Sequence, residues 1–326
     1  MRPPRTAPRS VQSGRWLPWA LSAAALAAGF TVGRNRGVDP QEPRRRPSAP
    51  PRRSTAGPQS YRQLREVLDT QRLRTVFQPV FGLKDGRLLS VEALTRFDRA
   101  VPGDTAAAVC PSEWFRRAGE LGLGVELELA AIDVALSSST ALAPDVPLSL
   151  NASPATLADP RLEGLLDRHE DRSIILEVTE HAIVRDYPEL GRAVTRLRER
   201  GCRLAVDDAG AGFASLRHVI RLAPEFIKLD ASLTQDIEHD PMRRALAASL
   251  VLFSRRTGSQ LIAEGIERAD DLAAWQQLGA DGAQGYLLAR PGPLRSWEEG
   301  PTLVRSGRFR PGRTVPVWSE RDAQSC

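Results

Sequence analysis

The sequence predicts an α/β protein whose strands close into a (β/α)8 barrel. Short apolar runs alternate with helix-like stretches from residue 61 to residue 295, a pattern typical of strands joined by helical crossovers. This part of the chain has the length of one such barrel, which is about 250 residues. Polar residues recur at the carboxyl ends of the runs, where active sites of this architecture lie.

Eight apolar runs are expected to form the strands. They lie at 75–81, 88–94, 147–151, 173–179, 202–207, 225–229, 260–264 and 282–286. Helices are expected at 61–72, 111–121, 125–138, 154–167, 188–200, 213–222, 241–256 and 269–278. From this pattern alone all the strands run parallel, because helical crossovers join strands of the same direction.

Composition divides the chain into five segments. They are a basic tail (1–15), an uncharged segment (16–33), a linker rich in proline and arginine (34–60), the barrel (61–295) and a C-terminal tail (296–326). The linker has no apolar periodicity, and so it is expected to be disordered.

The uncharged segment 16–33 has three interpretations. At about 1.5 Å per residue, a helix of this length barely crosses a hydrocarbon core about 30 Å thick. It is a membrane anchor, a secretory signal peptide, or an over-extended start of the reading frame or soluble helix. As an anchor, it is followed by many arginines, which favours an inner-membrane protein with its barrel in the cytoplasm. Without an anchor the protein is expected to be cytoplasmic.

The charge of the chain does not indicate a nucleic-acid polymer as partner. The net charge is +5 and arginine supplies nearly all the basic residues, since only Lys84 and Lys228 are lysines. Much of the excess lies in residues 1–60, and no base-reading motif accompanies it. The three cysteines are widely spaced and show no metal-ligand spacing.

Six consecutive strands end in polar residues that share one face when each strand is read with a period of two. These residues are Glu92, Asn151, Glu177, Asp207, Lys228 and Glu264. A single carboxylate at a strand end is most often a helix cap or a solvated loop residue. Six polar residues in phase are instead expected to meet at one mouth of the barrel.

The carboxylates among these residues predict a metal site, because without cations several would have to stay protonated. With the Asn151 carbonyl they form an all-oxygen ligand set, which suits Mg²⁺ or Mn²⁺ rather than Zn²⁺. Asp207 can point into the barrel and Asp208 can swing towards the same space. One carboxylate could then bridge two ions about 3.5–4 Å apart, as in the hydrolysis of a phosphodiester.

Two basic residues accompany this site. Lys228 could hold the attacking water or neutralise charge in the transition state, or it could be a surface lysine at a strand end. Arg96 follows Glu92 by four residues and could bind a phosphate oxygen, or it could be a solvated arginine.

Eight motifs in order resemble the EAL-type cyclic di-GMP phosphodiesterase family. They are FQPVF (77–81), VEALTRF (91–97), LNASP (150–154), LEVTE (176–180), VDDAGAGFASL (206–216), FIKLD (226–230), AEGIE (263–267) and AQGYLLARP (283–291). The resemblance covers about residues 60–295. It implies a TIM-like barrel with an antiparallel first strand, hydrolysis of cyclic di-GMP to linear pGpG with two Mg²⁺ or Mn²⁺ ions, and a homodimer formed through this domain.

The resemblance also implies a role for each site residue. The first metal would be bound by Glu92, Asn151, Glu177 and Asp207, and the second by Asp207, Asp208 and Glu264. The catalytic residues would be Lys228, which serves the nucleophilic water, and Glu264. The substrate side would be lined by Gln78, Leu94, Arg96 and Gln284. Glu180 would brace the loop after Asp208, and Glu267 would support the mouth.

The chain departs from the family pattern in the loop after Asp208. Ala209, Ala211, Phe213 and Ala214 replace the usual Phe, Thr, Tyr and Ser. No predicted ligand is lost. The altered loop leaves open a catalytically silent domain that binds cyclic di-GMP or docks a partner. A barrel hydrolase for another phosphodiester is a third interpretation.

Overall fold

The computed structural model describes residues 58–70, 72–97, 110–179, 184, 186–209 and 213–294, and two short strands at 302–303 and 309–310. The segment 16–33 and most of the linker 34–60 lie outside these residues. Within the described part of the chain, no helix is long and apolar enough to cross a bilayer.

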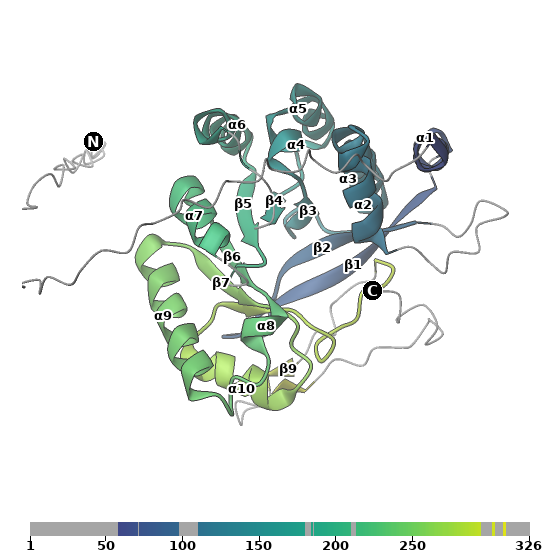
Figure 1. Ribbon diagram of the computed structural model, residues 1–326. Coiled ribbons are helices and arrows are strands. Elements are labelled where there is room, and N and C mark those ends of the chain that lie inside the picture. Colours follow the sequence, from purple (N-terminus) through teal and green to yellow (C-terminus); the bar gives the residue numbers. More distant parts are fainter. Residues whose placement is uncertain are drawn as a thin grey trace, which may run out of the picture. The chain divides into compact units, whose positions relative to one another are not determined.

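Eight strands form a closed barrel, and each pairs with the next one in the sequence (Figure 1). They are β1 (Leu73–Gly82), β2 (Leu88–Phe97), β3 (Leu148–Asn151), β4 (Ile174–Thr179), β5 (Arg203–Asp207), β6 (Phe226–Leu229), β7 (Gln260–Ala263) and β8 (Gly282–Ala283). The predicted barrel is therefore confirmed, with β8 shorter than expected.

The first strand is antiparallel to both of its neighbours, β2 and β8, and the remaining pairs are parallel. The all-parallel barrel expected from the alternation is thus wrong for β1, and the antiparallel first strand implied by the family resemblance is confirmed. The physical reason is the short turn 83–87 between β1 and β2, which is long enough for a hairpin but too short for a parallel crossover.

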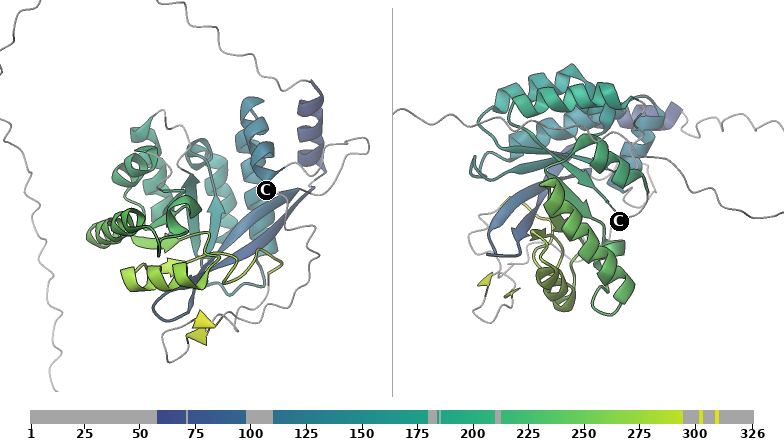
Figure 2. Two further views of the ribbon diagram at one scale, coloured as in Figure 1. Left: turned by 60° about the horizontal axis from the view of Figure 1, so that its bottom comes forward. Right: turned by 90° about the vertical axis from the view of Figure 1, so that its left-hand side faces the viewer.

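Helices lie outside the strands (Figures 1 and 2). They are α1 (Pro58–Asp69), α2 (Pro111–Glu120), α3 (Gly124–Ser138), α4 (Pro154–Ala158), α5 (Pro160–Leu166), α6 (Tyr187–Glu199), α7 (Phe213–Leu222), α8 (Ala231–Thr234), α9 (Pro241–Thr257) and α10 (Ala269–Leu278). A 3-10 turn, Asp167–His169, follows α5, and β9 (Thr302–Leu303) pairs with β10 (Phe309–Arg310).

One predicted helix is two helices in the structure. The segment 154–167 breaks at Asp159, whose ψ of 124° is extended rather than helical. Pro160 causes the break, because a proline disfavours helical geometry in the preceding residue. The Asp159 carboxylate then caps α5 by accepting a hydrogen bond from the Arg161 backbone N–H.

The interior of the barrel is apolar below its mouth. Val80, Ile175, Ala205, Phe226 and Ile262 form one buried cluster there. In each parallel strand the side chain two residues further along points to the same side, towards the mouth. The apolar layer therefore places the polar strand ends in a second layer above it, on a packed floor.

Strands β1 and β2 are the longest in the barrel, and Figure 2 shows them as a ribbon that outreaches the other strands. Its outer end packs on helices, with the Phe97 and Trp114 rings stacked at 5.2 Å and Leu73 buried beside Leu64 and Leu127. This packing holds the hairpin in place beyond the point where β3 ends.

A close backbone contact lies just after β8, at Gly285. An added Cβ at this position would overlap the backbone nitrogen and oxygen of Ile266. We expect Gly285→Ala to lower the free energy of unfolding by about 1–3 kcal/mol, because backbone cannot move aside as a flexible side chain can. Urea unfolding followed by circular dichroism measures this loss.

A second glycine provides the matched control. Gly191 lies inside α6, and an added Cβ there would have no heavy atom within 4 Å. Gly191→Ala should leave stability unchanged or raise it by about 0.5–1 kcal/mol. Equal unfolding midpoints for the two variants would contradict the steric argument.

Candidate active site

Five carboxylates from four strand ends gather at one mouth of the barrel. We call them the acidic cluster, and they are Glu92, Glu177, Asp207, Asp208 and Glu264. Carboxylate oxygens of Glu92, Glu177 and Asp207 lie within 4.8 Å of one another. Oxygens of Asp207, Asp208 and Glu264 form a second group of the same size. Asp207 belongs to both groups, so the cluster has the form of two adjoining sites with one shared ligand.

The backbone at the end of β5 explains how two neighbouring aspartates can face one space. Alternation along a strand would send Asp208 to the opposite side from Asp207. Asp208 instead has a φ of 55°, in the left-handed region that few non-glycine residues adopt. Its N–H donates to the Asp207 Oδ1 at 2.9 Å, and its carboxylate turns towards Glu264.

Lys228 lies at the centre of the cluster and is 3% exposed. Its Nζ is 2.6 Å from the Glu177 Oε2 and 2.8 Å from the Glu264 Oε1. The Glu92 Oε2 and the Asp207 Oδ1 each lie 3.3 Å away. One ammonium group is thus shared among four carboxylates, which leaves the cluster with an excess of negative charge.

This arrangement shifts the pKa of Lys228 upward. Burial alone lowers the pKa of an amine, but the charges of Asp207, Glu177, Glu264 and Glu92 together outweigh it and hold the pKa well above its ordinary value. Lys228 therefore stays protonated at neutral pH and serves as the internal counter-ion of the cluster.

Two of the carboxylates are shifted towards the protonated form. Burial raises the pKa of Glu177, and the charges of Glu92 and Asp207 raise it further, so that it reaches about 8 against the opposing effect of Lys228. Burial and then the charge of Asp207 raise the pKa of Glu264 well above its ordinary value. Both shifts report an accumulation of negative charge that a cation would relieve.

Glu92 is the exception, because hydrogen bonds stabilise its ionised form. Burial raises its pKa, but Lys228 and hydrogen bonds from Gln284 and Asn151 outweigh this effect, and the pKa falls below its ordinary value. The Gln284 Nε2 donates to the Glu92 Oε2 at 2.8 Å, and the Asn151 Nδ2 donates to the Oε1 at 3.2 Å. With its amide nitrogen used in this way, Asn151 keeps its carbonyl oxygen for another partner.

Gln78 and Gln284 form a chain of amides behind Glu92. The Gln284 Nε2 also donates to the Gln78 Oε1 at 3.2 Å, and the Gln78 Nε2 donates to the Ala289 carbonyl at 3.0 Å. Both glutamines are buried, and the Gln284 Oε1 has no hydrogen-bond partner within the described residues. Both residues therefore fix the orientation of Glu92 as well as lying on the predicted substrate side.

The remaining predicted residues lie around this centre. Leu94 and Arg96 are half-buried on β2 beyond Glu92, and the Arg96 guanidinium donates to the adjacent Thr95 carbonyl at 3.0 Å. Glu267 is exposed, three residues after Glu264. Glu180 lies outside the residues that the structure describes.

The short helix α8 supports the site and was not predicted from the sequence. The hydroxyl of the fully buried Thr234 donates to the Glu264 carbonyl, and the Gln235 Nε2 donates to the Gly265 carbonyl at 3.1 Å. Gly265 has a φ of 62°, and an added Cβ would lie 2.6 Å from that of Ala231. No sequence signal marks these contacts, because they join segments about 30 residues apart that meet only in the fold.

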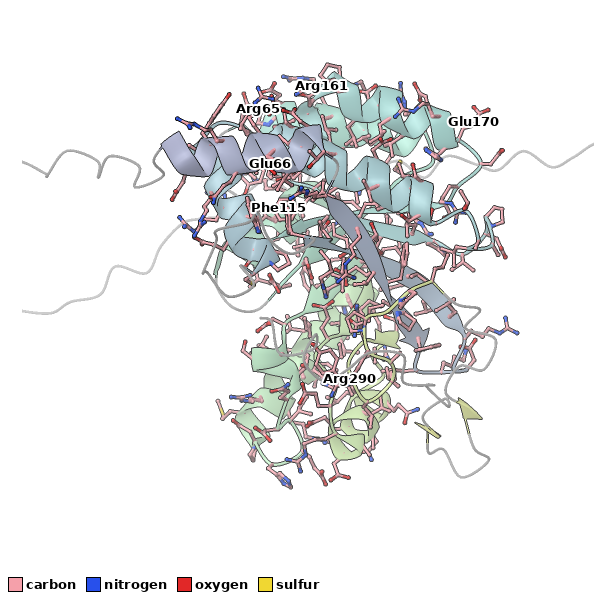
Figure 3. All side chains as sticks on the ribbon, turned by 90° about the vertical axis from the view of Figure 1, so that its right-hand side faces the viewer. Arg65, Glu66, Phe115, Arg161, Glu170 and Arg290 are labelled. Atoms are coloured by element: carbon pink, nitrogen blue, oxygen red, sulfur yellow. The ribbon has the colours of Figure 1, made fainter. Side chains whose placement is uncertain are left out.

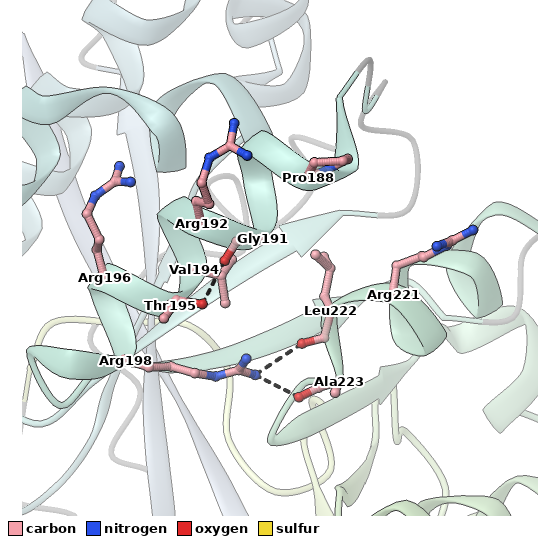
Figure 4. Close-up of a pocket in the computed structure, with 10 residues that line it drawn as sticks. All are labelled: Pro188, Gly191, Arg192, Val194, Thr195, Arg196, Arg198, Arg221, Leu222 and Ala223. Atoms are coloured by element: carbon pink, nitrogen blue, oxygen red, sulfur yellow. Dashed lines mark hydrogen bonds between the residues drawn. The ribbon is translucent and has the colours of Figure 1, made fainter. Parts of the chain in front are cut away.

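A separate groove lies on the outside of the barrel. It has a volume of about 740 Å³ between α6 and the end of α7, and Arg192, Arg196, Arg198 and Arg221 line it (Figure 4). Arg198 donates to the Leu222 and Ala223 carbonyls at its floor. No residue of the acidic cluster lines this groove, and so we place the chemistry at the mouth of the barrel.

The donor set at the mouth fits a hard divalent cation. The two adjoining groups contain only carboxylate oxygens, and histidine and cysteine, the usual ligands of softer metals, take no part in them. Five acids against one ammonium give a charge that cations would balance. The chemistry of the donors, and not merely their number, thus matches the ions expected from the sequence.

Comparison with known proteins identifies the family. The sequence model of the EAL domain family matches residues 61–291. A probable cyclic di-GMP phosphodiesterase, PdeI of Escherichia coli, is 28% identical over 256 residues, which are 75% of this chain and 32% of PdeI. The cyclic di-GMP phosphodiesterase NbdA of Pseudomonas aeruginosa is 28% identical over 268 residues, 79% of this chain and 33% of NbdA. The chain thus spans about a third of the length of these relatives.

Solved structures agree with this assignment. The PaMucR phosphodiesterase in a c-di-GMP complex is 27% identical, with a TM-score of 0.63 over 72% of this chain and 98% of that chain. The FimX EAL domain of Xanthomonas citri shares the fold, with a TM-score of 0.64 at 21% identity over 74% of this chain and 96% of that chain. From the matched family model and the acidic barrel mouth together, we conclude that the chain belongs to the EAL domain family.

Proposed function

We propose that this protein hydrolyses cyclic di-GMP to linear pGpG with two divalent cations, Mg²⁺ or Mn²⁺. The observation that carries the proposal is the pair of carboxylate groups that share Asp207. Two relatives bear the name of cyclic di-GMP phosphodiesterase, and PaMucR is a phosphodiesterase in complex with c-di-GMP. We extend that activity to this chain because its predicted ligands that lie in the described residues gather at one mouth.

The ligands divide between the two ions as the groups do. Glu92, Glu177 and Asp207 would hold one ion together with the Asn151 carbonyl, and Asp207, Asp208 and Glu264 would hold the other. When bound, such ions lower the pKa of a water molecule and stabilise charge on the leaving oxygen of a phosphodiester. The glutamine chain behind Glu92 keeps that carboxylate ionised and correctly turned before any ion arrives.

Lys228 and Glu264 would handle the proton of the attacking water. Glu264 is 2.8 Å from the Lys228 Nζ, and its carboxylate, ionised once cations balance the cluster, could accept that proton. Lys228 donates hydrogen bonds to Glu92 and Glu177. It would orient the water and offset the negative charge that develops on the phosphate.

The substrate would lie over the inner face of the β1–β2 hairpin. The residues that would contact it on this side of the mouth are Gln78, Leu94, Arg96 and Gln284. The half-buried Arg96 presents a guanidinium that can form two parallel hydrogen bonds with a phosphate. Leu94 provides apolar surface next to it.

A second function, cyclic di-GMP binding without turnover, is favoured by the departure at Ala209. This residue stands where the family pattern has a phenylalanine, and it is buried in the core cluster that contains Val206 and Ile227. A smaller side chain next to Asp208 removes packing that would fix the loop. A chain that binds cyclic di-GMP at micromolar concentration but forms no pGpG with either cation would establish this second function.

Removal of one cluster carboxylate should abolish hydrolysis. We expect Glu92→Gln in the full chain to lower kcat at least about a hundredfold, because it loses a charged ligand while its shape is kept. The measurement is chromatography of pGpG formed from cyclic di-GMP with Mg²⁺ or Mn²⁺. Glu170→Gln is the matched control, since Glu170 is exposed on the outer surface (Figure 3) and should keep full activity. Full activity of Glu92→Gln would exclude the proposed site.

The pH dependence of stability should reveal the charge of the empty cluster. The unfolded chain releases the Glu177 proton near its usual pKa of about 4.3, whereas the folded chain holds it until about pH 8. The folded state therefore binds more protons between these values, and the free energy of unfolding falls as the pH rises. Glu264 acts in the same direction. In EDTA, we expect urea unfolding to show a loss on the order of a few kcal/mol between about pH 5 and pH 8.

Two comparisons control this measurement. Saturating Mg²⁺ should abolish the fall, because the cations replace the protons as partners of the carboxylates. Glu177→Gln has no group to titrate at this position and should show a weaker dependence in EDTA. A stability that instead rises from about pH 5 to pH 8 in EDTA would show that the cluster is not strained by negative charge.

A further inference from the structure

The β1–β2 hairpin continues the inner surface of the barrel outward. Three residue pairs face each other in register on the inner side, and they are Gln78 with Glu92, Val76 with Leu94, and Arg74 with Arg96. Because side chains alternate along a strand, the arginine pair faces the same side as the Glu92 carboxylate. Arg74 was not among the residues predicted from the sequence.

The arginine pair stands beyond the wall of the barrel. Strand β2 pairs with β3 only as far as Ala93, and β1 pairs with β8 only at Phe81 and Gly82. The outer end of the hairpin is therefore bordered by neither strand, and its inner face overlooks the mouth. Arg96 follows Glu92 by four residues, about 13 Å along a strand.

The two guanidinium groups influence each other. Burial lowers the pKa of Arg96, and the charge of Arg74 lowers it further, whereas Tyr286 and Glu92 act in the opposite direction. Like charges directly opposite each other destabilise a strand pair. Both residues are half-buried, so that part of each side chain faces solvent and can meet an anion at this face.

A third guanidinium belongs to the segment after β8, which pairs with β1 through Phe77 and Gly292. Arg290 stacks over the ring of Tyr286 at 4.4 Å, and Tyr286 is 42% exposed. Figure 3 shows Arg290 on the segment that follows β8. The mouth thus combines the acidic cluster, which suits cations, with arginines that suit a ligand whose negative charge lies far from the ions.

We propose that Arg74, together with Arg96, holds the phosphodiester of the substrate that is not cleaved. This inference rests on the proposed function and extends it to substrate selection. A cyclic dinucleotide carries two phosphodiester groups in one ring, and when one reaches the acidic cluster, the other must lie several ångströms away. The arginine pair offers that second group a planar, bidentate partner from each strand. Arg74 is then a specificity-determining residue for substrates with two phosphates.

Selectivity between two substrates tests this role. Cyclic di-GMP has two phosphodiesters and bis(p-nitrophenyl) phosphate has one, so the ratio of their kcat/KM values measures recognition of the second group. In the full chain with Mg²⁺, we expect Arg74→Ala to lower this ratio about tenfold or more, mainly through the KM for cyclic di-GMP. Arg74→Lys should fall between, since it keeps the charge but loses the bidentate geometry. A ratio within about twofold of the unaltered chain would overturn the inference.

Arg87 provides the matched control from the same hairpin. It lies beside the turn at the opposite end, is strongly exposed, and contacts Asp85 at 3.6 Å. Arg87→Ala removes the same charge far from the mouth and should leave the ratio unchanged. A loss equal to that of Arg74→Ala would mean that net charge, and not the position of Arg74, sets the selectivity.

Binding without turnover separates this inference from the proposed activity. In EDTA, Arg74→Ala should raise the Kd for cyclic di-GMP about tenfold, and added salt should shrink the difference. If the chain binds cyclic di-GMP but never cleaves it, the proposed hydrolysis fails while this result still supports the arginine pair. If the chain cleaves cyclic di-GMP and the variant binds and cleaves it equally well, only the arginine pair is excluded.

Discussion

The ammonium group of Lys228, shared among four carboxylates at the mouth of a barrel, is the constraint on which the site depends. Burial and mutual repulsion act against five acids in so small a space, and a single cation cannot neutralise them. Burial and this crowding of negative charge raise the pKa values of Glu177 and Glu264. The site therefore carries an excess of negative charge that divalent cations would balance.

The barrel can hold this excess of negative charge because the residues around the cluster are packed and hydrogen-bonded. The apolar layer of Ile175, Phe226 and Ile262 closes the interior below the cluster. Above it, the buried Thr234 ties the end of β7 to α8, and the amide chain from Gln78 turns Glu92. Each acid has a positioned backbone or partner, and this limits how far the cluster can relax by moving apart.

Much of this arrangement could be predicted from strand phase alone. A period of two placed Glu92, Glu177 and Asp207 on one face, and closure of the sheet brought them together. The direction of β1 could not be read from the alternation, although the short turn before β2 carried the signal. The sequence also did not predict the left-handed φ of Asp208 or the contact between Gln78 and Gln284. These features depend on register and backbone geometry between segments up to 206 residues apart, which local patterns do not encode.

The opposite charges of the acidic cluster and of the hairpin arginines determine how a phosphodiester could approach. A substrate with two negative charges is repelled by the acidic cluster unless cations are bound, whereas the arginines on the hairpin attract it in either state. Under the proposed function, affinity for the nucleotide and competence to cleave it would reside in different parts of the mouth. A sequence that lost loop packing near Asp208 could keep the first and lose the second. This separation gives a physical reason why one fold can serve as an enzyme or as a receptor with the same ligand.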